Sequence, residues 1–412
     1  MLAEIISIGD ELLIGQIVNT NAAWMSRALN LANVRIKYMS VVGDDGEDIR
    51  RSLDLALSRV DVVLMTGGLG PTHDDITKKA VAEYFDSAEM VTDEKVLAHV
   101  KALFQRRNIR MAPVNEEQAL VPKKATVLWN DYGTAPGLLF ERDGRYCAIM
   151  PGVPAEMQHL MTERVLPLLK SKTKNVIIRH RTIRTAGIGE SLLFEKLSPI
   201  AELEKFGKIA FLPHFSVVDV RVSVYENDAI VAEQRLRAAE NYILDRVEKN
   251  VYGFDEDTIE SVIGRMLIGK KATLAVAESC TGGLVAHRLT NVSGSSQYFD
   301  RGLVTYSNAA KMQLLGVPEE ILQQHGAVSE ECAKAMADGV RRVSGTTYGI
   351  ATTGIAGPTG GTEEKPAGLV WVGLATPERV LAQKFLFTKD RLINKERFCQ
   401  MALNMLFREL KP

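Results

Sequence analysis

The sequence has few cysteines, and its four are far apart. They are Cys147, Cys280, Cys332 and Cys399, and no two of them form a C-x-x-C pair. A structural zinc site or a disulfide framework needs cysteines that cluster or pair in that way. The spacing argues against both and indicates a reducing compartment, so we expect a cytoplasmic protein.

A large net charge, a long apolar segment and a low-complexity run are also missing. The 50 Lys and Arg residues nearly cancel the 51 Asp and Glu residues, which leaves a net charge of −1. Such a chain lacks the field that gathers nucleic acid or an anionic membrane. Apolar stretches end well before the roughly 20 residues of a membrane span. The first segment, MLAEIISIGDEL, is acidic where a signal peptide is basic. We therefore expect no membrane association.

The chain is long enough for several hydrophobic cores. It has 412 residues, of which 46% are hydrophobic and 25% charged. These shares are typical of globular proteins. Domains cluster near roughly 100 to 200 residues, so two or three domains are expected.

The first part of the chain alternates between strand-like and helix-like segments. The strand-like segments EIISIGDEL, RIKYMSVVGDD and DVVLMTGGLG are separated by helical patterns. This order predicts a parallel sheet with helices on its faces. A hairpin is expected around Asp143-Gly144, and a helix is expected to begin at Pro154. We assign residues 1–172 to this domain.

The pattern changes after residue 172. Alternating strands at 176–186 and 216–225 and an amphipathic helix at 229–247 predict a small α+β module over residues 173–252. From residue 253 to residue 412, strands and helices alternate again. The predicted fold class is α/β, with two parallel-sheet domains joined by the α+β module.

Three segments of the last domain follow apolar strands and are rich in small polar residues and glycine. They are AESCTGG at 277–283, YSNAAK at 306–311 and ATTGIAGPTGG at 351–361. Ligands bind at such strand ends in open α/β sheets, and the N–H groups of the first segment, at the start of a helix, attract an anion such as phosphate. The alternative is that these turns only join one element to the next.

Lys311 is a candidate general base. Ser307 or Asn308 is a predicted helix N-cap, and Gly316 with Pro318 is the predicted stop, so Lys311 falls in the first helical turn. A cation there opposes the helix dipole, which lowers the pKa of the amine. The alternative is a solvated surface lysine.

Serine is the candidate nucleophile. No histidine occurs within these segments, and we expect surface or capping roles for the nearby His287 and His325. Without imidazole, serine paired with lysine is the remaining arrangement for nucleophilic catalysis. Cys280 is a rival nucleophile, although a small packing residue is its more common role.

Taken together, AESCTGG, Gly294-Ser295-Ser296, the 306–311 segment, TTGIAGP and Asp390-Arg391 resemble the CinA C-terminal family of nicotinamide mononucleotide deamidases. The resemblance implies hydrolysis of nicotinamide mononucleotide to nicotinate mononucleotide and ammonia, without a metal. Lys311, held neutral with help from Tyr306, would take the serine proton. We prefer Ser296 as nucleophile, with Ser279 close behind. Backbone amides near Ser296 or Thr353 would hold the oxyanion. The implied substrate-binding residues are Thr281, Gly282, Gly283, Ser295, Thr353, Gly354, Gly357 and Arg391.

The N-terminal domain has a second candidate site. TGGLGPTHDDIT, at 66–77, follows an apolar strand and opens a helix, which suits a phosphate cradle. It fits neither G-x-G-x-x-G nor G-x-x-x-x-G-K-[ST], which disfavours nicotinamide redox chemistry and Walker-type ATP hydrolysis. Carboxylates at predicted strand ends could hold Mg²⁺ against a diphosphate, or could simply cap helices and turns. They are Asp10, Glu11, Asp44, Asp45, Asp74 and Asp75.

IGDELLIGQIVNTN, TGGLGPTHDDITKKA and MPGVPAEM resemble the molybdopterin-binding fold of the MoaB/MogA type, in the form found in CinA proteins. The resemblance implies an ADP-ribose pyrophosphatase that depends on a divalent metal, Mg²⁺ or Co²⁺. The same fold also binds pterins or nucleotides without hydrolysis. The implied nucleotide-binding residues are Asp10, Asn19, Gly67, Gly68, Gly70, Thr77, Pro151 and Gly152, and the metal candidates are Asp44, Asp75 and Glu156.

The middle module resembles the KH-like linker domain of CinA proteins. Its Gly187-Ile188-Gly189-Glu190 does not fit the G-x-x-G that clamps nucleic acid. The basic strand Arg179, His180, Arg181 and Arg184 favours nucleic acid, but alternating basic residues usually mark a solvated face. We expect a spacer or dimer contact in a homodimer. The overall prediction is an enzyme of the pyridine nucleotide cycle that acts on nicotinamide mononucleotide and ADP-ribose. The alternatives are a non-catalytic nucleotide- or pterin-binding protein linked to competence or DNA damage, and a DNA-associated factor.

Overall fold

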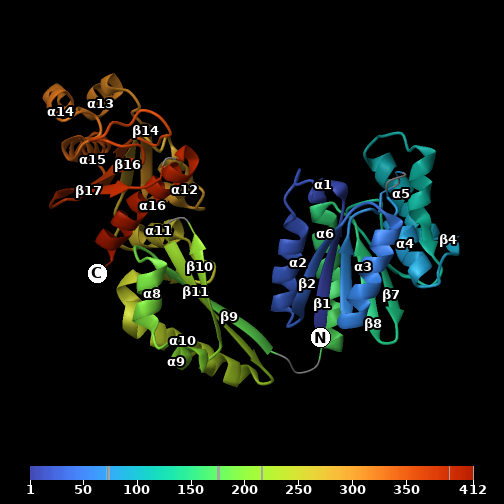
Figure 1. The fold of residues 1–412 in the computed structure, drawn as a ribbon. Helices are drawn as coiled ribbons and strands as arrows, with labels where there is room; N and C mark the ends of the chain where they lie inside the picture. The colour runs from blue at the N-terminus through green and yellow to red at the C-terminus, as the bar shows by residue number, and fades with distance from the viewer. Residues whose placement is uncertain (71, 73–74, 174–176, 215–216, 389, 412) are drawn as a thin grey trace. The chain divides into compact units, whose positions relative to one another are not determined.

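The computed structural model describes residues 1–70, 72, 75–173, 177–214, 217–388 and 390–411 (Figure 1). The chain divides into two compact units. The first consists of Met1–Arg179 with Val224–Glu233, and the second of His180–Ser223 with Gln234–Pro412. In the described part of the chain, no helix is long and apolar enough to cross a membrane.

The first unit is built on a six-stranded sheet of order β2-β1-β3-β8-β7-β6. The first four strands in this order run parallel. Strand β7 pairs with β8 in the antiparallel direction, and β6 pairs with β7 in the antiparallel direction. The predicted hairpin at Asp143-Gly144 joins β7 to β8, and the predicted helix begins at Pro154, so both predictions are confirmed. The strands are β1 (Leu2–Ile8), β2 (Arg35–Val42), β3 (Val62–Thr66), β6 (Thr126–Leu128), β7 (Gly137–Arg142) and β8 (Arg145–Met150).

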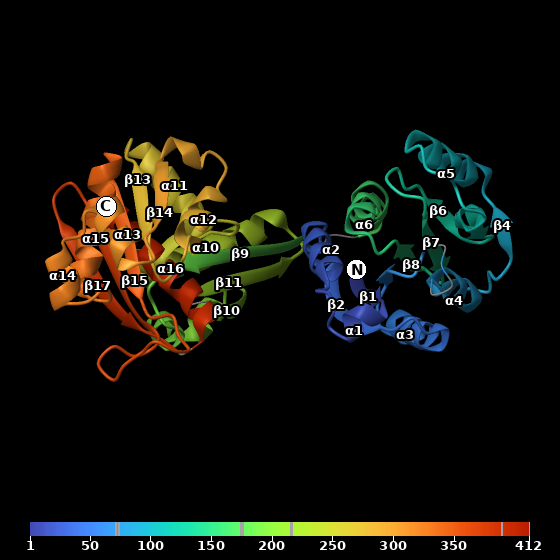
Figure 2. The same cartoon turned by 90° about the horizontal axis from the view of Figure 1, so that it is seen from above.

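Helices cover both faces of this sheet, because successive strand residues point to opposite sides. Ile5 packs with Met25 and Leu160, whereas the next residue, Ile6, packs with Leu53. Figure 2 shows this division of the helices. They are α2 (Thr20–Leu31) and α6 (Pro154–Leu160) on the Ile5 face, and α3 (Gly46–Arg59) and α4 (Thr77–Tyr84) on the other. Smaller elements are α1 (Asp10–Leu13), β4 (Met90–Thr92), α5 (Glu94–Arg106), β5 (Leu120–Pro122) and α7 (Leu166–Lys172).

The α+β module has a four-stranded sheet of order β10-β11-β9-β12. The predicted strands and amphipathic helix are present as β9, β11 and α10, whereas β10 was not predicted. Because β12 pairs with β9, this sheet extends past residue 252. The elements are β9 (Ile177–Thr185), α8 (Glu190–Leu197), α9 (Ile200–Glu204), β10 (Lys208–His214), β11 (Val217–Glu226), α10 (Ala229–Val247) and β12 (Val251–Phe254).

The C-terminal domain has a five-stranded sheet of order β14-β13-β15-β16-β17. The first three strands are parallel. Strand β16 pairs with β15 in the antiparallel direction, and β17 pairs with β16 in the antiparallel direction. The α/β architecture predicted for both large domains is therefore present, with antiparallel strands added at one edge of each sheet. The strands are β13 (Leu274–Glu278), β14 (Phe299–Val304), β15 (Tyr348–Gly354), β16 (Leu369–Ala375) and β17 (Val380–Leu386).

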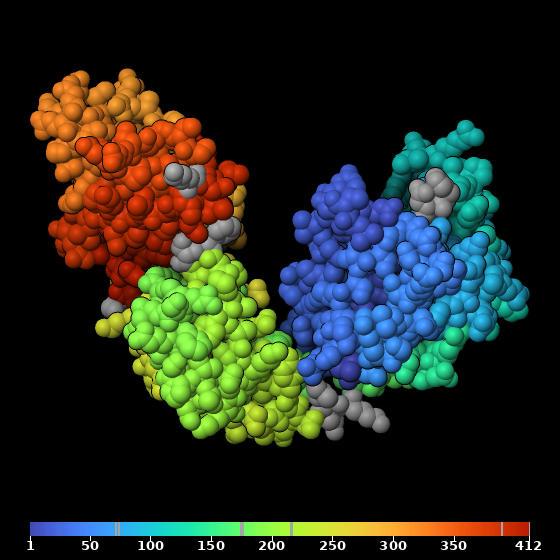
Figure 3. All heavy atoms as spheres, in the orientation of Figure 1, coloured from blue at the N-terminus to red at the C-terminus, as the bar shows by residue number. Residues whose placement is uncertain are grey.

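Two helical layers enclose this sheet. Val276 of β13 faces α11 (Ile259–Gly269), α12 (Leu284–Thr290) and α16 (Arg391–Leu410). Its neighbour Ala277 faces α13 (Asn308–Leu315), α14 (Glu319–Gln324) and α15 (Glu330–Ser344). Figure 3 shows the α+β module in direct contact with this domain. In that contact, Arg408 Nη2 donates a 3.1 Å hydrogen bond to the Gly187 carbonyl.

Candidate functional site

Three predicted segments of the C-terminal domain meet at one edge of its sheet. Ser279 follows β13, Tyr306 lies two residues beyond β14, and Gly354 ends β15. These strands are parallel neighbours, so their carboxyl ends lie side by side. The Ser279 N–H donates to the Thr352 carbonyl at 2.9 Å. The prediction that these strand ends form one site region is consistent with this arrangement.

Lys311 is buried in this region and touches Ser279. Its helix, α13, is capped by Ser307 and ends at Gly316, as the sequence predicts. The side chain is only 1% exposed, so the alternative of a solvated surface lysine is wrong. Its Nζ lies 3.2 Å from Ser279 Oγ and hydrogen-bonds to the carbonyls of Thr305 at 2.8 Å and Tyr306 at 3.3 Å.

The environment of Lys311 shifts its protonation equilibrium towards the neutral amine. Burial lowers the pKa of Lys311 from its ordinary value of 10.5, because desolvation penalises the ammonium form. Burial, rather than the helix dipole, is thus the leading cause of the lowered pKa. A neutral amine has two N–H groups and one lone pair. With both N–H groups on the Thr305 and Tyr306 carbonyls, the lone pair is left for the Ser279 hydroxyl.

The rival catalytic groups are in unsuitable positions. Cys280 is 5% exposed, and burial raises its pKa to about 12, so the thiol stays protonated near neutral pH. His287 and His325 are both exposed. The nearest polar partner of His287 is Asn291, at 3.2 Å, and that of His325 is Glu331, at 3.6 Å. These contacts agree with the surface roles predicted for both histidines.

Ser295 and Ser296 lie at the opposite edge of the sheet. They form a 3-10 turn before β14, whereas Ser279 follows β13. Leu274 of β13 pairs with Phe299 of β14, so the two strands start together. Strand β13 has five residues, so at about 3.3 Å per residue its two ends lie roughly 16 Å apart. Within one chain, the preference for Ser296 as partner of Lys311 is therefore corrected in favour of Ser279.

The turn after Ser279 is filled by a carboxylate of the chain itself. Glu278, 1% exposed, accepts hydrogen bonds from the N–H groups of Gly283 at 2.9 Å, Val285 at 3.1 Å and Ala286 at 2.8 Å. The Thr281 hydroxyl also donates to Glu278, at 2.6 Å. The expectation that this helix start binds a ligand phosphate is corrected, because Glu278 takes those donors. A glutamate at the end of an apolar strand was the available sequence signal.

A small cavity of about 170 Å³ adjoins Cys280, the residue after Ser279. Arg391 spans it, with Nη1 on the Gly357 carbonyl at 3.2 Å and Nη2 on the Tyr306 hydroxyl at 3.1 Å. The Tyr306 hydroxyl thus accepts a hydrogen bond from Arg391, whereas the contact of Tyr306 with Lys311 is through its backbone carbonyl. Thr353 donates its hydroxyl to the Ala327 carbonyl at 2.5 Å. The cavity is lined by Cys280, Tyr306, Gly354, Ile355, Ala356, Gly357, Thr359 and Arg391.

Lys395 brings a second cation to this region. It lies one turn after Arg391 on α16, and its Nζ is 3.6 Å from where a Cβ on Gly282 would stand. We find no hydrogen bond or ion pair of Lys395 with any described residue. Sequence reasoning missed this residue, although the i, i+4 spacing from Arg391 was a usable signal.

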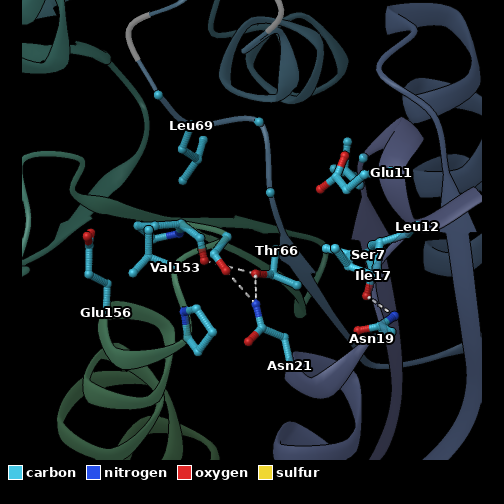
Figure 4. A pocket seen from close by; sticks show the side chains of 18 of the residues that line it. Ser7, Glu11, Leu12, Ile17, Asn19, Asn21, Thr66, Leu69, Val153 and Glu156 are labelled. Carbon is cyan, nitrogen blue, oxygen red and sulfur yellow. Dashed lines mark hydrogen bonds between the residues drawn. The ribbon is translucent and has the colours of Figure 1, made fainter. Parts of the chain in front are cut away.

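The first unit contains a pocket of about 520 Å³ at the carboxyl ends of β1, β3 and β8 (Figure 4). The lining includes most of the predicted nucleotide-binding residues and all three metal candidates, namely Asn19, Gly67, Gly68, Gly70, Pro151, Gly152, Asp44, Asp75 and Glu156. Two predicted residues are not in the lining. Asp10 accepts a 3.3 Å hydrogen bond from the Asp44 N–H, and Thr77 is fully buried behind Gly68.

Asn21 and Thr66 shape the floor of this pocket, and sequence reasoning did not single them out. Asn21 Nδ2 donates to the Gly152 carbonyl at 2.8 Å, and Thr66 Oγ1 donates to the Pro151 carbonyl at 2.9 Å (Figure 4). Asn21 Oδ1 is buried without a partner among the described residues. This oxygen can accept a hydrogen bond from a ligand.

Gly68 lets the backbone approach closely at this pocket. Its φ is +63°, and a Cβ there would lie 2.1 Å from Thr77 Oγ1. A side chain is therefore excluded both by the backbone conformation and by the lack of space. The glycine loop presents backbone atoms to the pocket, as a phosphate cradle requires.

The pocket carboxylates suit a metal that takes few protein ligands. Burial, together with the charges of Asp10, Glu11 and Asp75, raises the pKa of Asp44, although a backbone hydrogen bond opposes this. A cation would offset that repulsion. In the described ranges, no three His, Cys, Asp or Glu side chains gather as a metal-binding group. Mg²⁺ fits such a site, because it commonly takes one or two carboxylates plus substrate phosphates. Asp74 lies outside the described residues.

Two arginines on strand β9 of the α+β module are paired with carboxylates. Arg184 Nη1 lies 2.6 Å from Asp219, and Arg181 lies 3.4 Å from Glu240 and 3.5 Å from Asp255. Paired arginines offer little attraction to a phosphate backbone. The absence of nucleic-acid binding by this strand stays a prediction.

Comparisons with known proteins cover the whole chain. Family models match residues 4–171 ("Probable molybdopterin binding domain"), 180–253 ("Damage-inducible protein CinA KH domain") and 256–410 ("CinA C-terminal domain"). A CinA-like protein of Chloroherpeton thalassium is 46% identical and covers 100% of this chain and 99% of its own. A CinA-like protein of Salinibacter ruber is 45% identical and covers both chains completely, at 100%. The crystal structure of a CinA superfamily protein from Klebsiella pneumoniae is 35% identical, covers 37% of this chain and 95% of its own, and has a TM-score of 0.36.

Proposed function

The chain belongs to the CinA family, and on this premise we propose that its C-terminal domain hydrolyses nicotinamide mononucleotide to nicotinate mononucleotide and ammonia. The observation that carries the proposal is the buried contact between Lys311 Nζ and Ser279 Oγ, at 3.2 Å. A lysine with a lowered pKa next to a serine hydroxyl is a recognised base and nucleophile pair.

The reaction proceeds in two halves. Neutral Lys311 takes the proton of the Ser279 hydroxyl, and Oγ bonds to the carboxamide carbon. Backbone N–H groups of the 280–282 turn are assigned to the oxyanion. When the intermediate collapses, the C–N bond breaks, and the Lys311 ammonium gives its proton to the departing nitrogen, which leaves as ammonia. Water then attacks the acyl-serine and gives a proton to Lys311. The bond between the acyl carbon and Oγ breaks, Lys311 returns the proton to Ser279 Oγ, and nicotinate mononucleotide leaves.

Substrate binding is assigned to the cations of α16. Arg391 lines the cavity beside Cys280, and Lys395 lies at the Gly282 turn. The amides of the α12 start are occupied by Glu278, so side-chain cations are the better candidates for the 5′-phosphate. Two cations one turn apart on a helix suit a dianionic phosphate.

Product analysis tests this proposal. Purified protein incubated with nicotinamide mononucleotide is expected to release ammonia and nicotinate mononucleotide in equal amounts, and Lys311→Met is expected to release neither. Lys334→Met, which removes a half-buried lysine paired with Glu330, is the matched control and should behave as wild type. Release of free nicotinamide instead would indicate cleavage of the glycosidic bond and would contradict the proposal.

A second activity is proposed for the pocket of the first unit. The glycine loop, the Asn21 Oδ1 that lacks a partner among the described residues, and the pocket carboxylates support hydrolysis of a nucleotide diphosphate such as ADP-ribose with Mg²⁺ or Co²⁺. Asp44, with Glu11 or Asp75, would hold the cation, which would neutralise charge on the diphosphate. Asp44→Asn is expected to abolish AMP formation. Asp45→Asn is the matched control, because Asp45 caps α3 and is absent from the pocket lining. Nucleotide binding without AMP formation would favour the non-catalytic alternative.

A further inference from the structure

A separate cavity of about 430 Å³ lies between the α+β module and the C-terminal domain, within the second compact unit. Its residues on α16 include Asn404 and Arg408, and Arg408 lies 17 residues after Arg391. That separation is about 25 Å at roughly 1.5 Å per residue. The cavity is therefore distinct from the site around Ser279, and its size is typical of ligand pockets.

A chain of hydrogen bonds fixes the orientation of the Asn404 amide. Arg288 can only donate, and its Nη2 donates to Gln400 Oε1 at 2.9 Å. Gln400 Nε2 must then donate to Asn404 Oδ1, also at 2.9 Å. Glu260 anchors Arg288 at the start of this chain. The Asn404 Nδ2 group is thus fixed as a donor.

This donor has no acceptor among the residues that the structure describes. Asn404 is 4% exposed, and its Nδ2 is buried without a hydrogen-bond partner among the described residues. Buried polar groups are normally paired, so an unpaired donor in a cavity wall requires an explanation. One turn further along α16, the guanidinium of Arg408 donates to the Gly187 carbonyl and is joined to no carboxylate in the described part. Asn404 and Arg408, on one helical face, therefore line the same cavity.

Apart from His214 and Gln383, the remaining side chains of the walls are apolar and suit a flat molecule. Phe385 and Phe387 present nearly parallel rings, 15° apart in plane and 6.3 Å between centroids. Met401 and Met405 add thioether side chains, which pack well against aromatic rings. The module side contributes Ile188, Val217 and Val218. An apolar body would be held by these walls while an acceptor group faces α16.

We propose that this cavity binds a small organic carboxylate with a planar apolar body. The carboxylate accepts from Arg408 and from Asn404 Nδ2, and the body packs against Phe385, Phe387 and the two methionines. Because the residues come from both the module and the C-terminal domain, the ligand would join these two parts. This inference does not depend on the chemistry proposed at Ser279.

Methionine-methyl NMR on the full chain tests the proposal, with 2-naphthoate as the probe. Addition of the probe is expected to shift the methyl signals of Met401 and Met405 and to leave those of the buried Met25 and Met65 unchanged. The neutral analogue 2-naphthalenemethanol is expected to bind at least tenfold more weakly. Absence of shifts at Met401 and Met405, or equal binding of the neutral analogue, would overturn the proposal.

Two substitutions test the two polar contacts with the carboxylate one at a time. Arg408→Gln is expected to weaken 2-naphthoate binding at least tenfold. Asn404→Asp keeps an acceptor for Gln400 but places a negative oxygen where the donor was, so it is also expected to weaken binding at least tenfold. Arg379→Gln, which removes an exposed arginine paired with Glu409, is the matched control and should bind as wild type. Wild-type affinity in a folded Arg408→Gln protein would refute the assignment even if Asn404→Asp fails to fold.

Discussion

The Nζ atom of Lys311 lies 3.2 Å from the Oγ atom of Ser279, and the lysine side chain is 1% exposed. The other acceptors around Nζ matter as much as this distance. Both other partners of Nζ are backbone carbonyls, and no described carboxylate forms an ion pair with it. Desolvation therefore lowers the pKa of Lys311, which increases the share of the neutral base at a given pH.

The first prediction concerns the pH dependence of nicotinamide mononucleotide hydrolysis. Because only neutral Lys311 can accept the Ser279 proton, kcat/KM is expected to rise with pH and to level off. The apparent pKa of the rise should lie below the ordinary lysine value of 10.5, because burial lowers it. Initial rates measured from pH 6 to pH 10 give this profile. A rise centred at or above the ordinary lysine value would contradict the assignment of the base.

The second prediction concerns stability. Between the lowered pKa of folded Lys311 and the ordinary 10.5, the unfolded chain binds one more proton than the folded chain. The contribution of Lys311 to the free energy of unfolding therefore increases with pH across that window. Lys311→Met removes this contribution. Relative to wild type, the variant should be more stable at pH 7 than at pH 10, as measured by urea unfolding. A difference that does not change with pH would show that the lysine is not desolvated.

The third prediction separates phosphate binding from chemistry. If Lys395 binds the 5′-phosphate, Lys395→Gln should raise KM for nicotinamide mononucleotide roughly tenfold, which corresponds to about 1.4 kcal/mol. The value of kcat should change little. Nicotinamide riboside lacks the phosphate, so wild type and variant should process it equally. An equal loss with both substrates would indicate a structural role instead.

The fourth prediction concerns the pocket of the first unit. Gly68→Ala should impair hydrolysis of ADP-ribose, because the new Cβ would lie 2.1 Å from Thr77 Oγ1. Gly144→Ala is the matched control, since it has a similar positive φ of +74° but no atom within 4 Å. Both variants carry backbone strain, but only the first disturbs the glycine loop. Equal AMP formation by the two variants would argue against a role for this loop.

Much of the fold could be predicted because hydrophobic periodicity reports it directly. The parallel order of β13, β14 and β15 follows from alternating strands and helices, and it brings the segments after these strands to one edge. The position of Lys311 followed from a serine cap and a glycine stop, which are local signals. Strand β10 was missed, since its short run ends in Pro213-His214 and has no clear alternation.

The details of the candidate site depend on contacts that sequence spacing does not report. Ser296 is only 17 positions from Ser279, yet α12 carries the chain back across the sheet and leaves Ser296 at the other edge. Glu278 fills the helix start by a side-chain orientation that a motif does not specify. Asn21 reaches the Gly152 carbonyl across 131 residues of sequence. Such contacts require the assembled tertiary structure.

Parallel kinetics of Ser279→Ala and Ser296→Ala with nicotinamide mononucleotide test the central claim most directly. Loss of a nucleophile usually lowers kcat by about 10³-fold or more. We predict such a loss of ammonia release for Ser279→Ala and near wild-type release for Ser296→Ala. The reverse pattern, with Ser279→Ala active and Ser296→Ala inactive, would contradict the assignment of Ser279 as the nucleophile activated by Lys311.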